Sequence, residues 1–270
     1  MRVALVSDVF FTADGEARLR QRLADAKARG AKLAVLPEIP LNPWSPATST
    51  ARGEDAEPPA GPRHQILSRC AREGGIAVVG GAIVVDPSTG KRHNTALVFD
   101  ADGSLVGTYR KVHLPDEEGF REPCHYDPGA EPPRAIRAGD LTFGVQICSD
   151  MNRPEGSHLL GAMGASAIVN PRSTQSITYE RWKLVFRANA LTSTTYVLSV
   201  NRPGPEQGVE IGGPSIAVDP NGDVLVESTD PVVSVDVDEG VIKEARKRYP
   251  GYLAHFAGIY ARGWTGLDSV

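Results

Sequence analysis

The chain has 270 residues, of which 41% are hydrophobic and 23% charged, and its formal net charge is -4. These values are typical of a globular protein with a sizeable core, and the scattered basic residues give no surface for nucleic acid or an anionic membrane. No apolar run is long enough to span a membrane. The three cysteines, Cys70, Cys124 and Cys148, lack paired spacing. They indicate free thiols, and we therefore expect a cytoplasmic protein.

The opening of the chain predicts two parallel strands joined by a helix. An apolar strand at residues 2–7 is followed by a helical pattern at 16–29, in which leucine and alanine recur on one face. Gly30 ends that helix, and a second short strand follows at 32–36. A strand, a helix and a strand in this order form a β-α-β unit.

The middle of the chain predicts strands joined by tight turns. Residues 40–63 lack periodicity and predict a long loop, which is typical of a functional segment. A helix at 65–72 and a strand at 76–85 follow. Turn sequences that favour hairpins stand at four places: Pro87-Ser88-Thr89-Gly90, Asp102-Gly103, Gly139-Asp140 and Asn221-Gly222.

The last part alternates strands and helices, with no linker of distinct composition between two halves. Helical patterns occur at 154–164, 180–191 and 241–248, and strands at 167–170, 196–200 and 232–237. We therefore expect one α/β domain over residues 1–270, with helices covering the sheets. The hairpins make the sheets mixed. Two such halves would form two sheets stacked face to face with helices outside.

Three chemically active residues follow directly after predicted strands. Glu38 follows the second strand, Lys111 follows the strand at 105–110, and Cys148 follows the strand at 141–147. In α/β proteins, ligands bind beyond the carboxyl ends of the strands. We therefore expect the carboxylate, the ammonium group and the thiol to converge on one site.

A cysteine nucleophile needs such neighbours. A thiol with an ordinary pKa near 8.5 is mostly protonated at neutral pH and must be activated by a base or a positive charge. Glu38 would take the thiol proton, and Lys111 would stabilise the thiolate and an oxyanion. The backbone N–H of Ser149, at the turn after the nucleophile, is a second oxyanion donor.

The motifs around these residues resemble the nitrilase superfamily of carbon–nitrogen hydrolases over nearly the whole chain. The matching segments are Leu36-Pro37-Glu38, Tyr109-Arg110-Lys111-Val112-His113-Leu114-Pro115, Ile147-Cys148-Ser149-Asp150, Arg153-Pro154-Glu155, Arg187-Ala188, Tyr196-Val197, Asn201-Arg202, Gly212-Gly213-Pro214-Ser215 and Asp219-Pro220-Asn221-Gly222. The resemblance implies a four-layer α-β-β-α sandwich with a catalytic triad of Glu38, Lys111 and Cys148.

The resemblance also implies a second glutamate in the site. Members of the family often carry it seven residues before the glycine of a Pro-Gly pair. In this chain Glu122 stands at that position, ahead of Pro128-Gly129, and Glu117 and Glu118 are the alternatives.

No cofactor or metal is expected. The chain lacks phosphate-binding and dinucleotide-binding glycine motifs and paired C-x-x-C motifs. His113 and His125, with Asp116 or Asp127 nearby, do not match the spacing of a metal site.

The residues that would bind the substrate are less specific. Many family members have aromatic residues just after the nucleophile, whereas this chain has Met151 and Asn152. Asn42 and Trp44, in the long loop after Glu38, are candidate pocket walls.

Charged candidates point to two kinds of substrate. Arg153 and Arg172 would pair with the carboxylate of an ω-amide or N-carbamoyl acid. Asp116 and the two glutamates that follow it would instead favour a cationic amine.

The expected reaction is hydrolysis of a small linear amide to a carboxylate and ammonia through a thioester on Cys148. Cleavage of an N-carbamoyl amino acid or amine, or of a nitrile, on the same residues is the alternative. An alternative of another class is a scaffold or small-molecule sensor that has kept the fold without turnover.

The C-terminal tail predicts association between subunits. Residues 249–270 carry Tyr249, Tyr252, Phe256, Tyr260 and Trp264. Aromatic residues at this density indicate a packed surface, either on the chain's own domain or on a second subunit. The family resemblance also implies a homodimer or a higher homo-oligomer.

Overall fold

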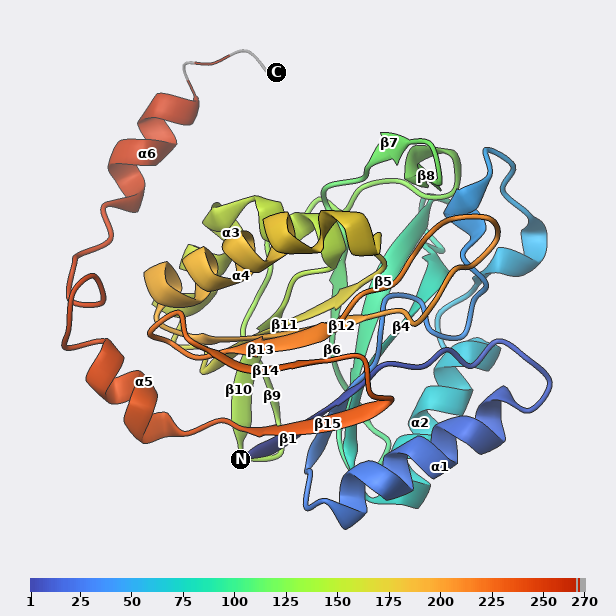
Figure 1. Cartoon of the computed structure of the whole chain (residues 1–270). Coiled ribbons are helices and arrows are strands. Elements are labelled where there is room, and N and C mark those ends of the chain that lie inside the picture. Colours follow the sequence, from blue (N-terminus) through green and yellow to red (C-terminus); the bar gives the residue numbers. More distant parts are fainter. Residues whose placement is uncertain (266, 268–270) are drawn as a thin grey trace.

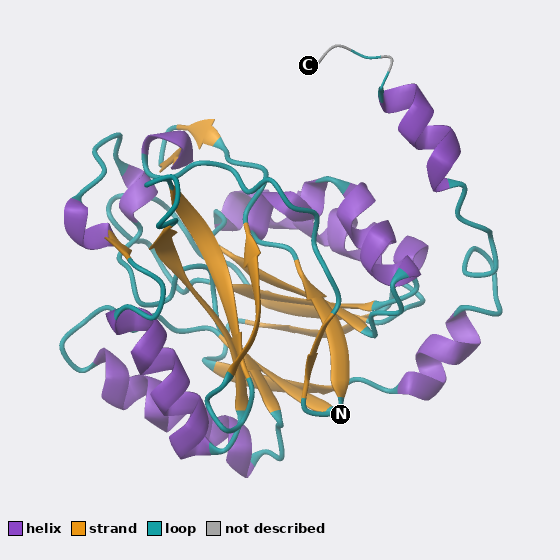
Figure 2. Cartoon of the chain, turned by 180° about the vertical axis from the view of Figure 1, so that it is seen from behind, coloured by secondary structure: helices purple, strands orange, loops and turns teal. Residues whose placement is uncertain are grey.

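Two stacked mixed sheets form the centre of the protein in a computed structural model that describes residues 1–265 and 267 (Figure 1). Helices cover the outer face of each sheet, so the layers run helix, sheet, sheet, helix in both views (Figures 1 and 2). The predicted four-layer α-β-β-α sandwich is confirmed.

The first sheet contains the N-terminal strands. In spatial order it consists of β15 (Val232–Asp236), β1 (Arg2–Val6), β2 (Leu33–Val35), β4 (Ala77–Val85), β5 (Arg92–Phe99) and β6 (Leu105–Arg110), with β3 (Ala56–Glu57) paired to β4. Strands β1, β2 and β4 are parallel, as the β-α-β pattern predicts. The hairpins β4–β5 and β5–β6 are antiparallel, at the predicted turns.

The second sheet repeats this plan with later segments. Its order is β14 (Val224–Ser228), β13 (Ser215–Val218), β12 (Tyr196–Asn201), β11 (Ala167–Arg172), β10 (Leu141–Val145) and β9 (Ile136–Ala138). Strands β10, β11 and β12 are parallel, and the outer pairs are antiparallel. β15, which follows all other strands in the sequence, belongs to the first sheet and pairs with β1.

Apolar side chains on both faces of the sheets produce the layering. Between the sheets lies a core that includes Val35 and Val98 from the first sheet and Phe143 and Val169 from the second. Helices α1 (Gly15–Ala28) and α2 (Pro62–Gly74) pack on the first sheet. Helices α3 (Pro154–Ala162) and α4 (Tyr179–Ser193) pack on the second. None of the helices in the described residues is long and apolar enough to cross a membrane.

The irregular segments contain more structure than the sequence predicts. The long loop at 40–63 holds two 3-10 turns and the short strand β3. The stretch at 111–133 holds a small hairpin of β7 (Asp116–Glu117) and β8 (Phe120–Arg121). These elements are too short for their periodicity to be recognised.

The C-terminal tail leaves the body of the protein as an arm (Figure 1). After α5 (Glu239–Ala245), the chain continues to α6 (Ala257–Trp264), whose large side chains are exposed. Residues 266 and 268–270 of the predicted tail lie outside the described residues.

Candidate active site

The two sheets bring the three predicted residues to one end of the sandwich. Glu38 follows β2 and Lys111 follows β6, both in the first sheet, while Cys148 follows β10 in the second. Parallel strands present their carboxyl ends at the same edge of a sheet, which places Glu38 and Lys111 together. The turn that contains Cys148 joins them from the second sheet, because Ser149 Oγ donates to the carbonyl of His113 at 2.5 Å.

Lys111 lies between two buried carboxylates. Its Nζ is 2.8 Å from Glu38 Oε1 and 2.6 Å from Glu122 Oε1, and all three side chains are inaccessible to solvent. The alternatives Glu117 and Glu118 are exposed on the small hairpin. Of the three candidates for the second glutamate, Glu122 is therefore the one that the fold places against Lys111.

Burial and charge together set the ionisation of this cluster. Burial acts to lower the pKa of Lys111, but the carboxylates of Glu122 and Glu38 outweigh it and raise the pKa above its usual value. Burial raises the pKa of Glu122 to about 8, with a further contribution from Glu38 and opposition from Lys111. At neutral pH Lys111 is therefore charged and the carboxyl group of Glu122 beside it is mostly protonated.

Cys148 is held as a protonated thiol in the resting protein. Burial, reinforced by the negative charge of Glu38, raises the pKa of Cys148 above its ordinary range, and Lys111 opposes this. The thiol donates a hydrogen bond to the carbonyl oxygen of Ser173 at 3.8 Å. Its activation therefore requires a base close by.

The backbone at Cys148 adopts a conformation that L-residues avoid. Its φ angle is 46°, at the start of the 3-10 turn Cys148–Asn152. Such a conformation costs on the order of 1–3 kcal/mol and persists when surrounding contacts enforce it. Asn170 supplies one such contact, because its Nδ2 donates to the carbonyl oxygens of Gln146 at 2.7 Å and Cys148 at 3.3 Å.

Sequence reasoning missed the residues that orient Glu38. Asn94, on β5, donates from Nδ2 to Glu38 Oε1 at 2.8 Å and lies 3.5 Å from the hydroxyl of Tyr126. The sequence contains no specific signal for Asn94, because β5 opens with four polar residues, of which Asn94 is the third. The second oxygen of each carboxyl group, Glu38 Oε2 and Glu122 Oε2, has no hydrogen-bond partner among the described residues.

Arg202 is a second missed residue, and it ties the two sheets together at the site. It follows β12, and its Nη1 donates to the carbonyl oxygens of Glu38 at 2.9 Å and Ile39 at 3.1 Å. Its Nη2 donates to the carbonyl of Asn42 at 3.0 Å. The Glu206 carboxylate balances the charge of the guanidinium group, with Oε1 at 2.6 Å from Arg202 Nη2. The guanidinium group therefore fixes the turn that carries Glu38, where Ile39 has a φ angle of 38°.

The predicted pocket residues after Glu38 lie in the interior. Trp44 donates from its indole nitrogen to the carbonyl of Gly119 at 2.8 Å and packs on Phe120. Asn42 donates from Nδ2 to the carbonyl of Asp55 at 2.9 Å. Trp44 therefore holds the long loop against the small hairpin, and Asn42 holds two parts of that loop together.

The other predicted pocket residues are dispersed. Met151 packs in the cluster beneath α3 and α4, and Asn152 is exposed. Asp116 is exposed and pairs with Arg121 at 3.3 Å. Arg153 is exposed and lines a separate cavity. The fold does not gather these side chains around Cys148.

Arg172 is fully buried near the nucleophile, but protein groups bind its guanidinium. Nε donates to Ser199 Oγ at 2.8 Å, and the other nitrogens donate to Thr174 Oγ1 and the carbonyl of Pro214. Burial lowers the pKa of Arg172 to about 10, which leaves it charged at neutral pH.

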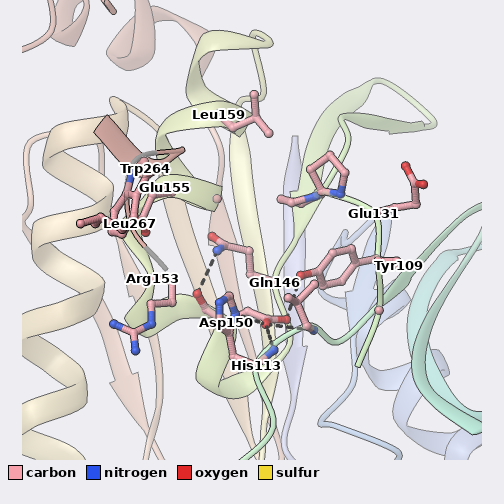
Figure 3. Close-up of a pocket in the computed structure, with 16 residues that line it drawn as sticks. Tyr109, His113, Glu131, Gln146, Asp150, Arg153, Glu155, Leu159, Trp264 and Leu267 are labelled. Carbon is pink, nitrogen blue, oxygen red and sulfur yellow. Dashed lines mark hydrogen bonds and ion pairs between the residues drawn. The ribbon is translucent and has the colours of Figure 1, made fainter. Parts of the chain in front are cut away.

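Asp150 lines a cavity of about 790 Å³ (Figure 3). Its lining includes Tyr109, His113, Gln146, Arg153 and Leu159. The predicted nucleophile is not among the lining residues. Within residues 1–265 and 267, no group of three or more His, Cys, Asp and Glu side chains is arranged to hold a metal ion.

An α-β-β-α sandwich with a buried cysteine, lysine and two glutamates at one end of its sheets defines a hydrolase of the cysteine-dependent, carbon–nitrogen type. The model of the carbon–nitrogen hydrolase family matches residues 13–247. The chain therefore belongs to the carbon–nitrogen hydrolase family.

Known relatives agree with this assignment. The chain is 33% identical to omega-amidase NIT3 of Saccharomyces cerevisiae, with 81% of this chain and 79% of the relative covered. It is 28% identical to human omega-amidase NIT2, with 92% and 91% covered. The crystal structure of yeast Nit3, a member of branch 10 of the nitrilase superfamily, has a TM-score of 0.79 at 31% identity and covers 93% of this chain and 94% of that chain.

Proposed function

We propose that this protein cleaves a small linear amide to a carboxylate and ammonia, with Cys148 as nucleophile, Glu38 as base and Lys111 as oxyanion partner. The observation that carries the proposal is the buried contact of Lys111 with Glu38 and Glu122, at the same end of the sheets as Cys148. A lysine and two carboxyl groups are costly to bury, and such clusters occur where chemistry needs them.

In the acylation step, Glu38 takes the Sγ proton of Cys148 through its unpaired Oε2 while sulfur attacks the amide carbon. The carbonyl oxygen becomes an oxyanion, which Lys111 Nζ and the Ser149 N–H stabilise. The tetrahedral intermediate collapses when Glu38 returns the proton to nitrogen. The carbon–nitrogen bond breaks, and ammonia leaves a thioester on Cys148.

In the deacylation step, Glu38 accepts a proton from a water molecule as the water attacks the thioester carbon. The carbon–sulfur bond then breaks, and the proton returns to the Cys148 sulfur. Glu122 holds Lys111 from the other side at 2.6 Å, so the ammonium group stays in place through both steps.

The relatives define the first substrates to test. Both curated relatives named above carry the name omega-amidase, so we propose an amide whose other end is a carboxylate. Arg172 adds no support to this choice, because Ser199, Thr174 and the carbonyl of Pro214 already accept hydrogen bonds from its guanidinium group.

The test is ammonia release from ω-amide acids, simple primary amides, N-carbamoyl amino acids and nitriles. Wild type and Cys148→Ala are compared, and intact-mass measurement detects the acyl-enzyme. Turnover of an amide that requires Cys148 supports the proposal. Turnover of carbamoyl substrates or nitriles alone would redefine the substrate class. No turnover, with iodoacetamide reacting no faster at Cys148 than at Cys70 or Cys124, would indicate a scaffold.

We further propose that the chain is a single catalytic domain that forms a homo-oligomer. Ile177, Leu184 and Leu191 are exposed, and their seven-residue spacing places them along one side of the α4 region. The described part of the arm, residues 249–265 and 267, exposes further large apolar side chains, and patches of this kind mark protein contacts. Light scattering on Leu184→Glu and on a chain truncated after Lys247 tests this; unchanged mass for both would refute it.

We also propose a reducing, cytoplasmic location. The structure leaves Cys70, Cys124 and Cys148 as free thiols, and a thiol nucleophile is kept active by a reducing compartment. Detection of the protein in fractionated cells tests the location.

A further inference from the structure

Asp150, two residues after the nucleophile, is a buried acid bonded to both sides of Lys111. Its Oδ2 accepts a hydrogen bond from the hydroxyl of Tyr109 at 2.9 Å. Its Oδ1 accepts from the backbone N–H groups of Val112 at 3.2 Å and His113 at 2.9 Å, and from the His113 ring at 2.8 Å. The carboxylate therefore binds the chain on both sides of Lys111, at Tyr109 before it and at Val112 and His113 after it (Figure 3).

The same carboxylate closes the turn that contains Cys148. The N–H of Ile147 donates to Asp150 Oδ2 at 3.2 Å, and the N–H of Asp150 donates to the Ile147 carbonyl at 3.0 Å. This reciprocal pair brackets the cysteine, whose φ angle is 46°. Contacts of this kind are what a strained backbone conformation requires.

A further bond runs directly between the two segments. Ser149 Oγ donates to the carbonyl of His113 at 2.5 Å. Asp150 and Ser149 therefore connect the turn after β10, in the second sheet, to the chain after β6, in the first. Asp150 is 1% exposed and accepts five bonds, which a carboxylate does and an amide cannot, because the amide nitrogen is a donor.

We propose that Asp150 is a positioning residue for the hydrolysis, which sets the Lys111 ammonium group against the Cys148 sulfur. It acts through the backbone on either side of these residues and does not contact the substrate. The inference rests on the proposed roles of Cys148 and Lys111. It predicts that disturbing the carboxylate slows the chemical step rather than substrate binding.

The test compares Asp150→Asn with Tyr109→Phe, which removes one of the five bonds and keeps the ring. Glu57→Gln is the matched control, because Glu57 is 3% exposed and accepts the Arg63 and His64 N–H groups at the start of α2, away from the site. The readouts are kcat, KM, the fraction folded by circular dichroism, and the rate at which iodoacetamide alkylates Cys148.

For Asp150→Asn we expect kcat per folded molecule to fall about 100-fold, the size of effect of a 1 Å displacement in an active site. KM should change less than threefold, and alkylation of Cys148 should slow because Lys111 no longer stabilises the thiolate. Tyr109→Phe should lower kcat about three- to tenfold in the same pattern. Glu57→Gln should lower only the folded fraction and leave kcat, KM and the alkylation rate per folded molecule unchanged.

The proposal is overturned if Asp150→Asn and Tyr109→Phe change only the folded fraction, as Glu57→Gln does, or if they raise KM at unchanged kcat. If Asp150→Asn does not fold, Tyr109→Phe decides between these outcomes. Wild type without turnover on any amide would refute the proposed function separately. The alkylation rate of Cys148 would then still test Asp150, because it requires no substrate.

Discussion

Replacing Lys111 with methionine should make the stability of the protein depend more strongly on pH. The variant keeps the aliphatic chain but removes the cation from between Glu38 and Glu122, whose side chains are fully buried. In wild type the pKa of Glu122 is about 8, so this carboxyl group is mostly protonated at neutral pH. Without Lys111, two carboxyl groups this close in a buried site must hold a second proton.

The size and sign of the effect follow from proton linkage. Unfolded glutamates titrate near pH 4.3, so above that pH unfolding of the variant releases one proton more than unfolding of wild type. The stability difference should therefore grow by about 1.4 kcal/mol per pH unit as the pH rises. It should be about 1 kcal/mol at pH 5 and reach about 5 kcal/mol by pH 8, which is the upper end of the usual cost of breaking a buried ion pair.

Urea unfolding of wild type and Lys111→Met at pH 5, 6, 7 and 8 measures this difference. Lys183→Met is the control, because Lys183 pairs with Glu227 at 2.6 Å on the surface and should cost less than about 1 kcal/mol at every pH. Lys111→Met/Glu38→Gln should remove the additional slope. A stability difference that stays constant from pH 5 to 8 would refute the reasoning.

Three further predictions concern the surroundings of the site. Glu122→Gln should keep kcat at pH 7 within about tenfold, because Glu122 is mostly neutral there. The wild-type rate should fall above pH 8, because ionised Glu122 adds a negative charge beside Cys148 and disfavours the thiolate. pH–rate profiles of the variant should show no such fall. Arg202→Leu should lower the free energy of unfolding by about 3–5 kcal/mol because Glu206 loses its partner, and Arg202→Leu/Glu206→Leu should recover part of it in urea titrations. In Gly144→Ala the new methyl group would overlap the methyl groups of Leu160 on α3, which should lower the free energy of unfolding by about 1–3 kcal/mol. Steady-state assays should show kcat per folded molecule unchanged.

The sequence pattern was sufficient for the strand ends, whereas the four-layer fold was predicted from the family resemblance. Glu38, Lys111 and Cys148 each follow an apolar strand, and the fold places all three at one end of the sheets. Turn residues such as Asn221-Gly222 located the hairpins, because few sequences accept the backbone angles of such turns. These features depend on local spacing, which a single sequence contains.

The residues that hold the site together were not predictable in this way. Arg202 donates to the carbonyl of Glu38 across 164 sequence positions, and Asn94 reaches the Glu38 carboxylate across 56. Asp150 stands beside the nucleophile, yet its bonds to Tyr109 and His113 depend on how the two sheets stack. The dispersal of Met151 and Arg153 to other surroundings has the same origin.

The order of strands has a consequence for synthesis on the ribosome. β1 (Arg2–Val6) emerges before every other strand of its sheet, and its antiparallel partner β15 (Val232–Asp236) emerges after all of them. Until β15 has emerged, one edge of β1 stays open to pairing with other chains, which is the arrangement that promotes aggregation. The nascent chain is therefore expected to depend on protection of this edge, by a chaperone or by slow release, until the last strand closes the first sheet.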